Sequence, residues 1–139
     1  MKKTLFAFMA FALLSCGPQQ EPASPADELM DRLAGLVEDG KIMYGHQDDL
    51  LYGHSWKLAE DAAEFIQSDV HSVTGHYPAV FGTDLGGIEM GWESSLDKNR
   101  FDHIRAAAAA HHERGGIVTF SWHLRNPFTG GDTWDVTST

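Results

Sequence analysis

The sequence predicts an α/β fold of parallel strands, because three strand-length apolar runs are separated by helix-forming segments. The runs occupy 41–45, 79–83 and 117–122, and their first residues are evenly spaced along the chain. Apolar and polar residues do not alternate within them, which is typical of strands buried on both faces. Strands that alternate with helices indicate parallel β/α units. We therefore expect about three such units.

Four helices are expected, at 25–39, 55–66, 69–74 and 101–114. The first begins with Ser24 as N-cap and Pro25 as first helical residue. The three longer segments repeat apolar residues at three- and four-residue spacing, which is the pattern of an amphipathic helix. The short segment is preceded by the capping residue Ser68 and followed by Gly75, which favours a helix end.

An eight-unit (β/α)8 TIM barrel needs about 250 residues, and the sequence has 139. We therefore expect a partial barrel, truncated after about the first three β/α units, over residues 25–139. The competing fold is a doubly wound sheet, which normally carries a glycine-rich phosphate turn after its first strand. The residues that follow the first strand here are polar and anion-repelling (HQDD, 46–49), which favours the barrel.

The N-terminus has the pattern of a lipoprotein signal peptide, predicted at 1–15. A basic start precedes an apolar run that is too short to span a bilayer. The run ends in Leu-Leu-Ser-Cys, which resembles the bacterial lipobox, and Cys16 is the sole cysteine. The resemblance implies cleavage before Cys16, a lipid on its thiol and attachment to a membrane.

Residues 16–24 are rich in proline and glutamine and are predicted to be a disordered tether. Gly17 follows the lipidated cysteine where inner-membrane retention would favour Asp, so an outer-membrane location in the cell envelope is expected. The formal net charge is −10, and an acidic protein repels phosphate backbones. Nucleic acid is therefore not an expected partner.

Polar and aromatic residues follow the predicted strands, where parallel barrels carry their active sites. His46 follows the first strand, Asp84 and Glu89 follow the second, and Trp122 and His123 end the third. Carboxylates and imidazoles hydrogen-bond to sugar hydroxyls, and flat rings pack on the apolar face of a sugar. The combination indicates carbohydrate recognition.

Three segments resemble the first three strand-and-loop segments of glycoside hydrolase family 26: 45–49 (GHQDD), 77–89 (YPAVFGTDLGGIE) and 115–128 (GGIVTFSWHLRNPF). Most members are endo-β-1,4-mannanases. The resemblance implies a (β/α)8 barrel and a retaining mechanism with two glutamates, after the fourth and seventh strands. We therefore expect the catalytic glutamates to be missing from this chain, and the chain alone to be inactive. Glu89 and Glu93 follow the second strand and are not assigned to catalysis.

By position in the family, His123 would hydrogen-bond to the sugar and Trp122 would pack beneath it. Asp84 and Glu89 would face or brace the cleft, His46 would end the first strand, and Trp134 could stack on a sugar. The implied partner is β-mannan or a related polysaccharide, with no cofactor and no metal.

Two alternatives remain open. The chain could be a non-catalytic, glycan-binding surface lipoprotein that uses the same cleft wall. It could also be a metal-dependent barrel hydrolase, if His46, Asp84 and His123 converge on a metal. The other histidines form no metal-ligand motif. The acidic pairs at 48–49 and 60–61 are interpreted as solvated charge.

Overall fold

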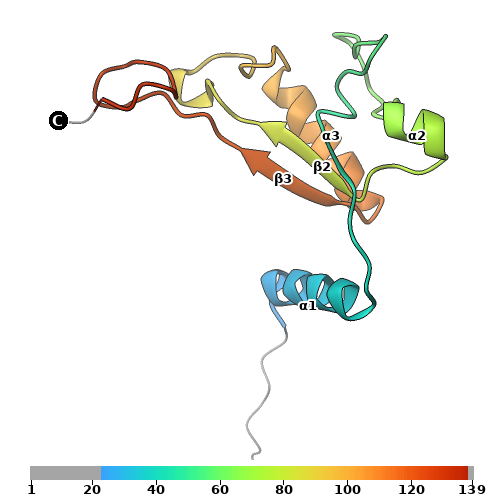
Figure 1. The fold of residues 1–139 in the computed structure, drawn as a ribbon. Coiled ribbons are helices and arrows are strands. Elements are labelled where there is room, and N and C mark those ends of the chain that lie inside the picture. Colours follow the sequence, from blue (N-terminus) through green and yellow to red (C-terminus); the bar gives the residue numbers. More distant parts are fainter. Residues whose placement is uncertain (1–22, 138–139) are drawn as a thin grey trace, which may run out of the picture. The chain divides into compact units, whose positions relative to one another are not determined.

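A computed structural model describes residues 23–137 (Figure 1). The chain divides into two compact units, one ending at Lys41 and the other starting at Ile42. The predicted signal peptide at 1–15, Cys16 and most of the tether lie outside the described residues. Within 23–137, no helix combines the length and the apolar character that crossing a membrane requires.

The first unit contributes one helix, α1 (Pro25–Glu38), which agrees with the prediction. Ser24 and Asp27 form a capping box: the Asp27 amide donates to Ser24 Oγ at 3.2 Å, and the Ser24 amide donates to the Asp27 carboxylate at 3.0 Å. These bonds satisfy backbone donors that a helix N-terminus leaves unpaired. Gly40, with φ of +65°, follows the helix end.

The second unit is a three-stranded parallel sheet in the order β1 (Gly45–Gln47), β2 (Val80–Asp84), β3 (Ile117–Ser121). Helix α2 (Asp69–Thr74) lies between β1 and β2; the 3-10 turn η1 (Ile88–Met90) and α3 (Phe101–Glu113) lie between β2 and β3. Figure 1 shows α3 along β2 and β3. This topology confirms the prediction of parallel β/α units, and it is the arrangement expected of part of a barrel.

The first strand lies later than predicted. Pairing with β2 runs only from Gly45↔Val80 to Gln47↔Gly82, although the apolar run begins at 41. Ile42 is 97% exposed, so this part of the run is not buried against the sheet. The Tyr44 carbonyl accepts from the amide of Val80, which marks the start of the association.

The predicted helix at 55–66 is wrong, because the chain there is irregular. Its backbone groups bond across the segment: the Leu58 amide donates to the Leu51 carbonyl at 3.0 Å, and the amide of Gly53 donates to the carbonyl of Trp56 at 2.9 Å. The apolar spacing arises because Leu58 and Phe65 pack against the core. Ile66, placed on the same helical face by the prediction, is 56% exposed.

The core lies between the sheet and α3, and its buried apolar residues are Leu50, Leu51, Phe65, Phe81, Ile104 and Ala107. The Phe81 ring contacts the ring of His111 on α3, with centroids 5.8 Å apart. Successive side chains of a strand point to opposite faces. Phe81 and Thr83 therefore face the helix, whereas Gly82 and Asp84 face the other side, which is the interior in a β/α barrel.

Candidate functional site

Asp84, at the end of β2, binds two residues at the end of β3. Its Oδ2 accepts from Ser121 Oγ at 2.7 Å and lies 2.5 Å from His123 Nδ1. Its Oδ1 accepts from the Gly86 amide at 2.6 Å. The β2–β3 register pairs Asp84 with Ser121, so both side chains stand on the sheet face away from α3. The structure thus brings two of the predicted site residues, Asp84 and His123, into direct contact.

The Asp84 carboxylate is held in its ionised form. Burial opposes ionisation, but hydrogen bonds from Ser121, the Gly86 amide and His123 outweigh it and lower the pKa of Asp84. The Asp84 side chain is 3% exposed, whereas that of His123 is 49% exposed. The pair therefore anchors one edge of an imidazole inside the protein and presents the rest of the ring to solvent.

Glu89, in η1, ties the loop after β2 to the segment after β3. Its Oε2 accepts from Trp122 Nε1 at 3.1 Å and from the Gly87 amide at 3.0 Å, and its Oε1 accepts from the Arg125 amide at 3.1 Å. The hydrogen bond from the Trp122 indole is the main reason that the pKa of Glu89 lies below its usual value. Glu89 therefore braces Trp122, which is 50% exposed.

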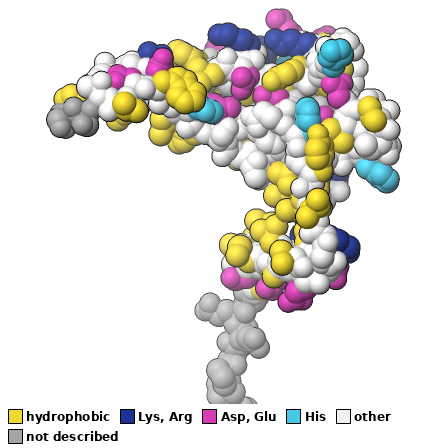
Figure 2. Space-filling model, viewed as in Figure 1, with side chains coloured by type: hydrophobic (Ala, Val, Ile, Leu, Met, Phe, Trp, Pro, Cys, Tyr) yellow, Lys and Arg dark blue, Asp and Glu magenta, His cyan; other side chains and the backbone are white. Residues whose placement is uncertain are grey.

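Asn126 organises the loop that follows. Its Oδ1 accepts from the Phe128 amide at 2.9 Å, and its Nδ2 donates to the Asp135 carbonyl at 2.9 Å. The loop exposes Phe128 and Trp134, the latter by 81%. Figure 2 shows hydrophobic side chains on the surface of the C-terminal part of the chain, to which this loop belongs. Among residues 23–137, no hydrogen bond or ring contact involves the indole ring of Trp134.

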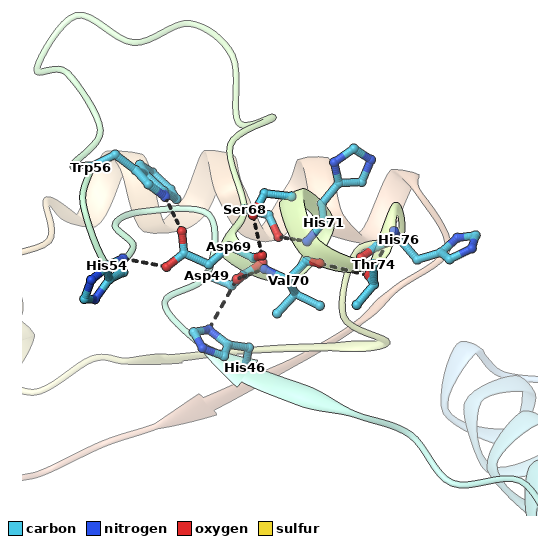
Figure 3. A network of polar contacts seen from close by, with 11 residues as sticks. His46, Asp49, His54, Trp56, Ser68, Asp69, Val70, His71, Thr74 and His76 are labelled. Atoms are coloured by element: carbon cyan, nitrogen blue, oxygen red, sulfur yellow. Dashed lines mark hydrogen bonds and ion pairs between the residues drawn. The ribbon is translucent and has the colours of Figure 1, made fainter.

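His46 is not brought to Asp84 and His123. It pairs in register with Phe81, so it stands on the helix-facing side of the sheet. Its Nδ1 lies 3.3 Å from Asp49 Oδ1 (Figure 3). Among residues 23–137, no group of three or more acidic, histidine or cysteine side chains is arranged to hold a metal.

Asp69 holds the start of the irregular segment at 55–66, as Figure 3 shows. Asp69, at the start of α2, accepts from the His54 amide at 2.5 Å and from Trp56 Nε1 at 2.8 Å. These bonds lower the pKa of Asp69, with the His54 amide as the largest cause. They fix residues 54–56 against the start of α2, where the predicted helix would have begun.

The interpretation of Asp48 and Asp49 as solvated charge is wrong, since both are 0% exposed. Burial raises the pKa of Asp48 to about 6, although the neighbouring Thr83 hydroxyl opposes the shift. Within the described part of the chain, neither carboxylate oxygen of Asp48 has a partner at full hydrogen-bond geometry. Asp48 also has φ of +53°, a conformation that favours Asn, Asp and Gly. The order of polar and apolar residues around positions 48 and 49 did not indicate that these two side chains are buried.

Comparisons with known proteins agree on one family. A family model described as glycosyl hydrolase family 26 matches residues 18–139. A mannan endo-1,4-beta-mannosidase of Bifidobacterium adolescentis is 37% identical over 107 residues, covering 70% of this chain and 10% of that protein.

Solved structures give the same result. A GH26 beta-mannanase of Bacteroides ovatus is 43% identical with a TM-score of 0.67, over 80% of this chain and 31% of that one. An endo-beta-1,4-mannanase of Cellulomonas fimi is 30% identical with a TM-score of 0.56, over 78% of this chain and 24% of that one. The chain thus spans less than a third of the length of each relative described here.

Proposed function

The chain belongs to glycosyl hydrolase family 26, and on that premise we propose that it forms one wall of the substrate cleft of an endo-β-1,4-mannanase. The relatives described above carry that activity in their names. The proposal concerns the whole enzyme, since the chain spans only part of each relative. Its substrate is β-1,4-mannan or a closely related polysaccharide.

The contact between Asp84 and His123 carries the proposal. Two residues that are 39 positions apart meet at the C-terminal ends of neighbouring parallel strands, where barrel enzymes bind their substrates. The half-exposed imidazole can hydrogen-bond to a sugar hydroxyl, since a hydroxyl group both donates and accepts. The exposed indoles of Trp122 and Trp134 offer flat apolar surfaces for the sugar ring.

The acidic residues at this edge do not have the properties of a general acid. Glycoside hydrolysis requires a carboxylic acid that keeps its proton until the leaving oxygen takes it. The pKa values of Asp84 and Glu89 are both lowered by the hydrogen bonds that they accept. Asp48 has a raised pKa but is fully buried. We therefore assign the role of general acid to none of these three carboxyl groups, and we assign Asp84 and Glu89 to holding the sugar-binding residues His123 and Trp122.

Affinity electrophoresis tests this assignment. We expect the chain to be retarded in native gels that contain soluble β-mannan, and less so in gels that contain a soluble β-glucan. His123→Ala is expected to reduce the retardation, whereas His76→Ala, which alters an exposed histidine beyond α2, is expected to leave it unchanged. Equal migration of the chain in gels with and without mannan would contradict the proposal.

The same experiment bears on the alternative of a glycan-binding surface protein. Retardation by mannan fits both functions, so release of manno-oligosaccharides by the full-length protein separates them. If the full-length protein binds mannan but releases no manno-oligosaccharides from it, the glycan-binding function is favoured over the enzyme.

We further propose that Cys16 carries a lipid that anchors the protein to the outer membrane of the cell envelope. The lipobox-like residues and the sole cysteine support this proposal. Cys16→Ala is expected to move the protein from the membrane fraction to the soluble fraction. Mass spectrometry of an N-terminal peptide without an acyl modification on Cys16 would contradict it.

A further inference from the structure

We propose that Asp84 is a positioning residue that fixes the tautomer of His123, so that His123 Nε2 presents a lone pair to a sugar hydroxyl. The inference deepens the proposed function, because it assigns the direction of one hydrogen bond in the sugar site. It rests on the placement of protons around a single buried carboxylate.

The partners of Asp84 determine which nitrogen of His123 carries a proton. Both carboxylate oxygens are occupied: Oδ1 accepts from the Gly86 amide and Oδ2 accepts from Ser121 Oγ. An ionised carboxylate can only accept. The short contact with His123 Nδ1, at 2.5 Å, therefore requires the proton to be on Nδ1.

The free nitrogen of His123 follows from the geometry of the ring. The two nitrogens of an imidazole point in divergent directions, and in the neutral ring one donates while the other accepts. Because Nδ1 is bound to the buried carboxylate, Nε2 points away from Asp84, on a side chain that is 49% exposed. It is available as an acceptor for a hydroxyl proton.

Ser121 makes the arrangement specific. Its hydroxyl lies 2.7 Å from Asp84 Oδ2 and 3.3 Å from the Thr83 carbonyl, and its single proton goes to the nearer acceptor. Oδ2 thus receives two donors, from Ser121 and from His123, while the Gly86 amide holds Oδ1. The carboxylate cannot turn without losing a backbone hydrogen bond.

Asp84→Asn is expected to invert the tautomer while keeping the shape of the side chain. The Gly86 amide requires an acceptor, so the Asn oxygen takes the Oδ1 position and the NH2 group takes the Oδ2 position. That NH2 group donates to His123 Nδ1, which must then give up its proton. His123 Nε2 becomes a donor, and the sugar hydroxyl loses its acceptor.

The test is nitrogen NMR of the chain with ¹⁵N-labelled histidine at about pH 8, above the ordinary titration range of histidine. His123→Ala identifies the His123 signals by their disappearance. We expect a protonated Nδ1 and an unprotonated Nε2 in the wild type, and the reverse in Asp84→Asn. Ser121→Ala is the matched control: it removes a donor from the same carboxylate oxygen and should keep the wild-type tautomer.

A second measurement joins the tautomer to sugar binding. Titration with mannohexaose is expected to show about tenfold weaker affinity for Asp84→Asn, as for the loss of one hydrogen bond. His76→Ala, which alters an exposed histidine beyond α2, should bind within about twofold of the wild type.

The outcomes separate the two proposals. If Asp84→Asn keeps Nδ1 protonated, or inverts the tautomer without weakening mannohexaose binding, the positioning role is wrong. If His123→Ala binds mannohexaose as well as the wild type does, the sugar-binding role of His123 fails, whichever tautomer is observed.

Discussion

Replacing Asp48 by asparagine should stabilise the fold at neutral pH. The buried carboxyl has a pKa raised from 3.8 to about 6, so the folded state binds its proton more tightly than the unfolded state does. The contribution of this group to stability is complete below about pH 4 and is lost as the pH rises through 6. A shift of 2.2 units, the difference between those two values, corresponds to about 3 kcal/mol.

Asparagine is a matched replacement for Asp48 on two grounds. It has the same shape without an ionisable group, and it tolerates the positive φ of +53° at this position. We expect the difference in free energy of unfolding between Asp48→Asn and the wild type to grow in favour of the variant by about 2–3 kcal/mol from pH 4 to pH 8. Taking the difference between the variant and the wild type removes the pH dependence that both proteins share.

The assay is urea unfolding followed by tryptophan fluorescence at several pH values. Asp61→Asn is the control, because Asp61 is an exposed carboxylate that is not among the groups that shift the pKa of Asp48. Its removal should leave the pH dependence almost unchanged. Parallel pH profiles of Asp48→Asn and the wild type would refute the reasoning, since they would mean that burial does not raise the pKa of Asp48.

Three further changes probe the core, a loop and the site. Phe81→Ala should destabilise the fold by about 3–5 kcal/mol in urea unfolding, since Phe81 is fully buried; a loss below 1 kcal/mol would contradict its central place. In Gly53→Ala, the new methyl group would overlap the Asp69 carboxylate. A lowered melting temperature is expected, and an unchanged one would show that the loop adapts freely. Glu89→Gln weakens the acceptor for the Trp122 indole, so Trp122 fluorescence and mannan retardation should change; wild-type behaviour in both would exclude the bracing role.

The sequence was sufficient for the elements whose local signals agree with their burial. Helices α2 and α3, and strands β2 and β3, lie within one residue of their predicted bounds at each end. Here capping residues, glycines and apolar runs all mark the same boundaries. The β2–β3 register then puts Asp84 beside Ser121, so the main contact of the site follows from the strand ends.

The errors have a common physical cause, since each depends on contacts between distant residues. The segment at 55–66 carries helical spacing, yet its geometry is set by Asp69 through the His54 amide and the Trp56 indole. His46 was expected to follow the first strand, but it lies within β1 and pairs in register with Phe81, so it stands on the helix-facing side of the sheet. The spacing of apolar residues along the sequence cannot predict either the hydrogen bonds of Asp69 or the register of β1.

Mapping mannohexaose binding by amide chemical shifts tests the account most directly. The central claim is that the C-terminal ends of β2 and β3, with the loops that follow them, form the sugar-binding wall. We expect the mannohexaose-dependent shifts to cluster at residues 84–89, 121–126 and around Trp134, and a β-glucan oligosaccharide to produce smaller shifts. Shifts centred on α2, or none at all at saturating mannohexaose, would contradict the claim.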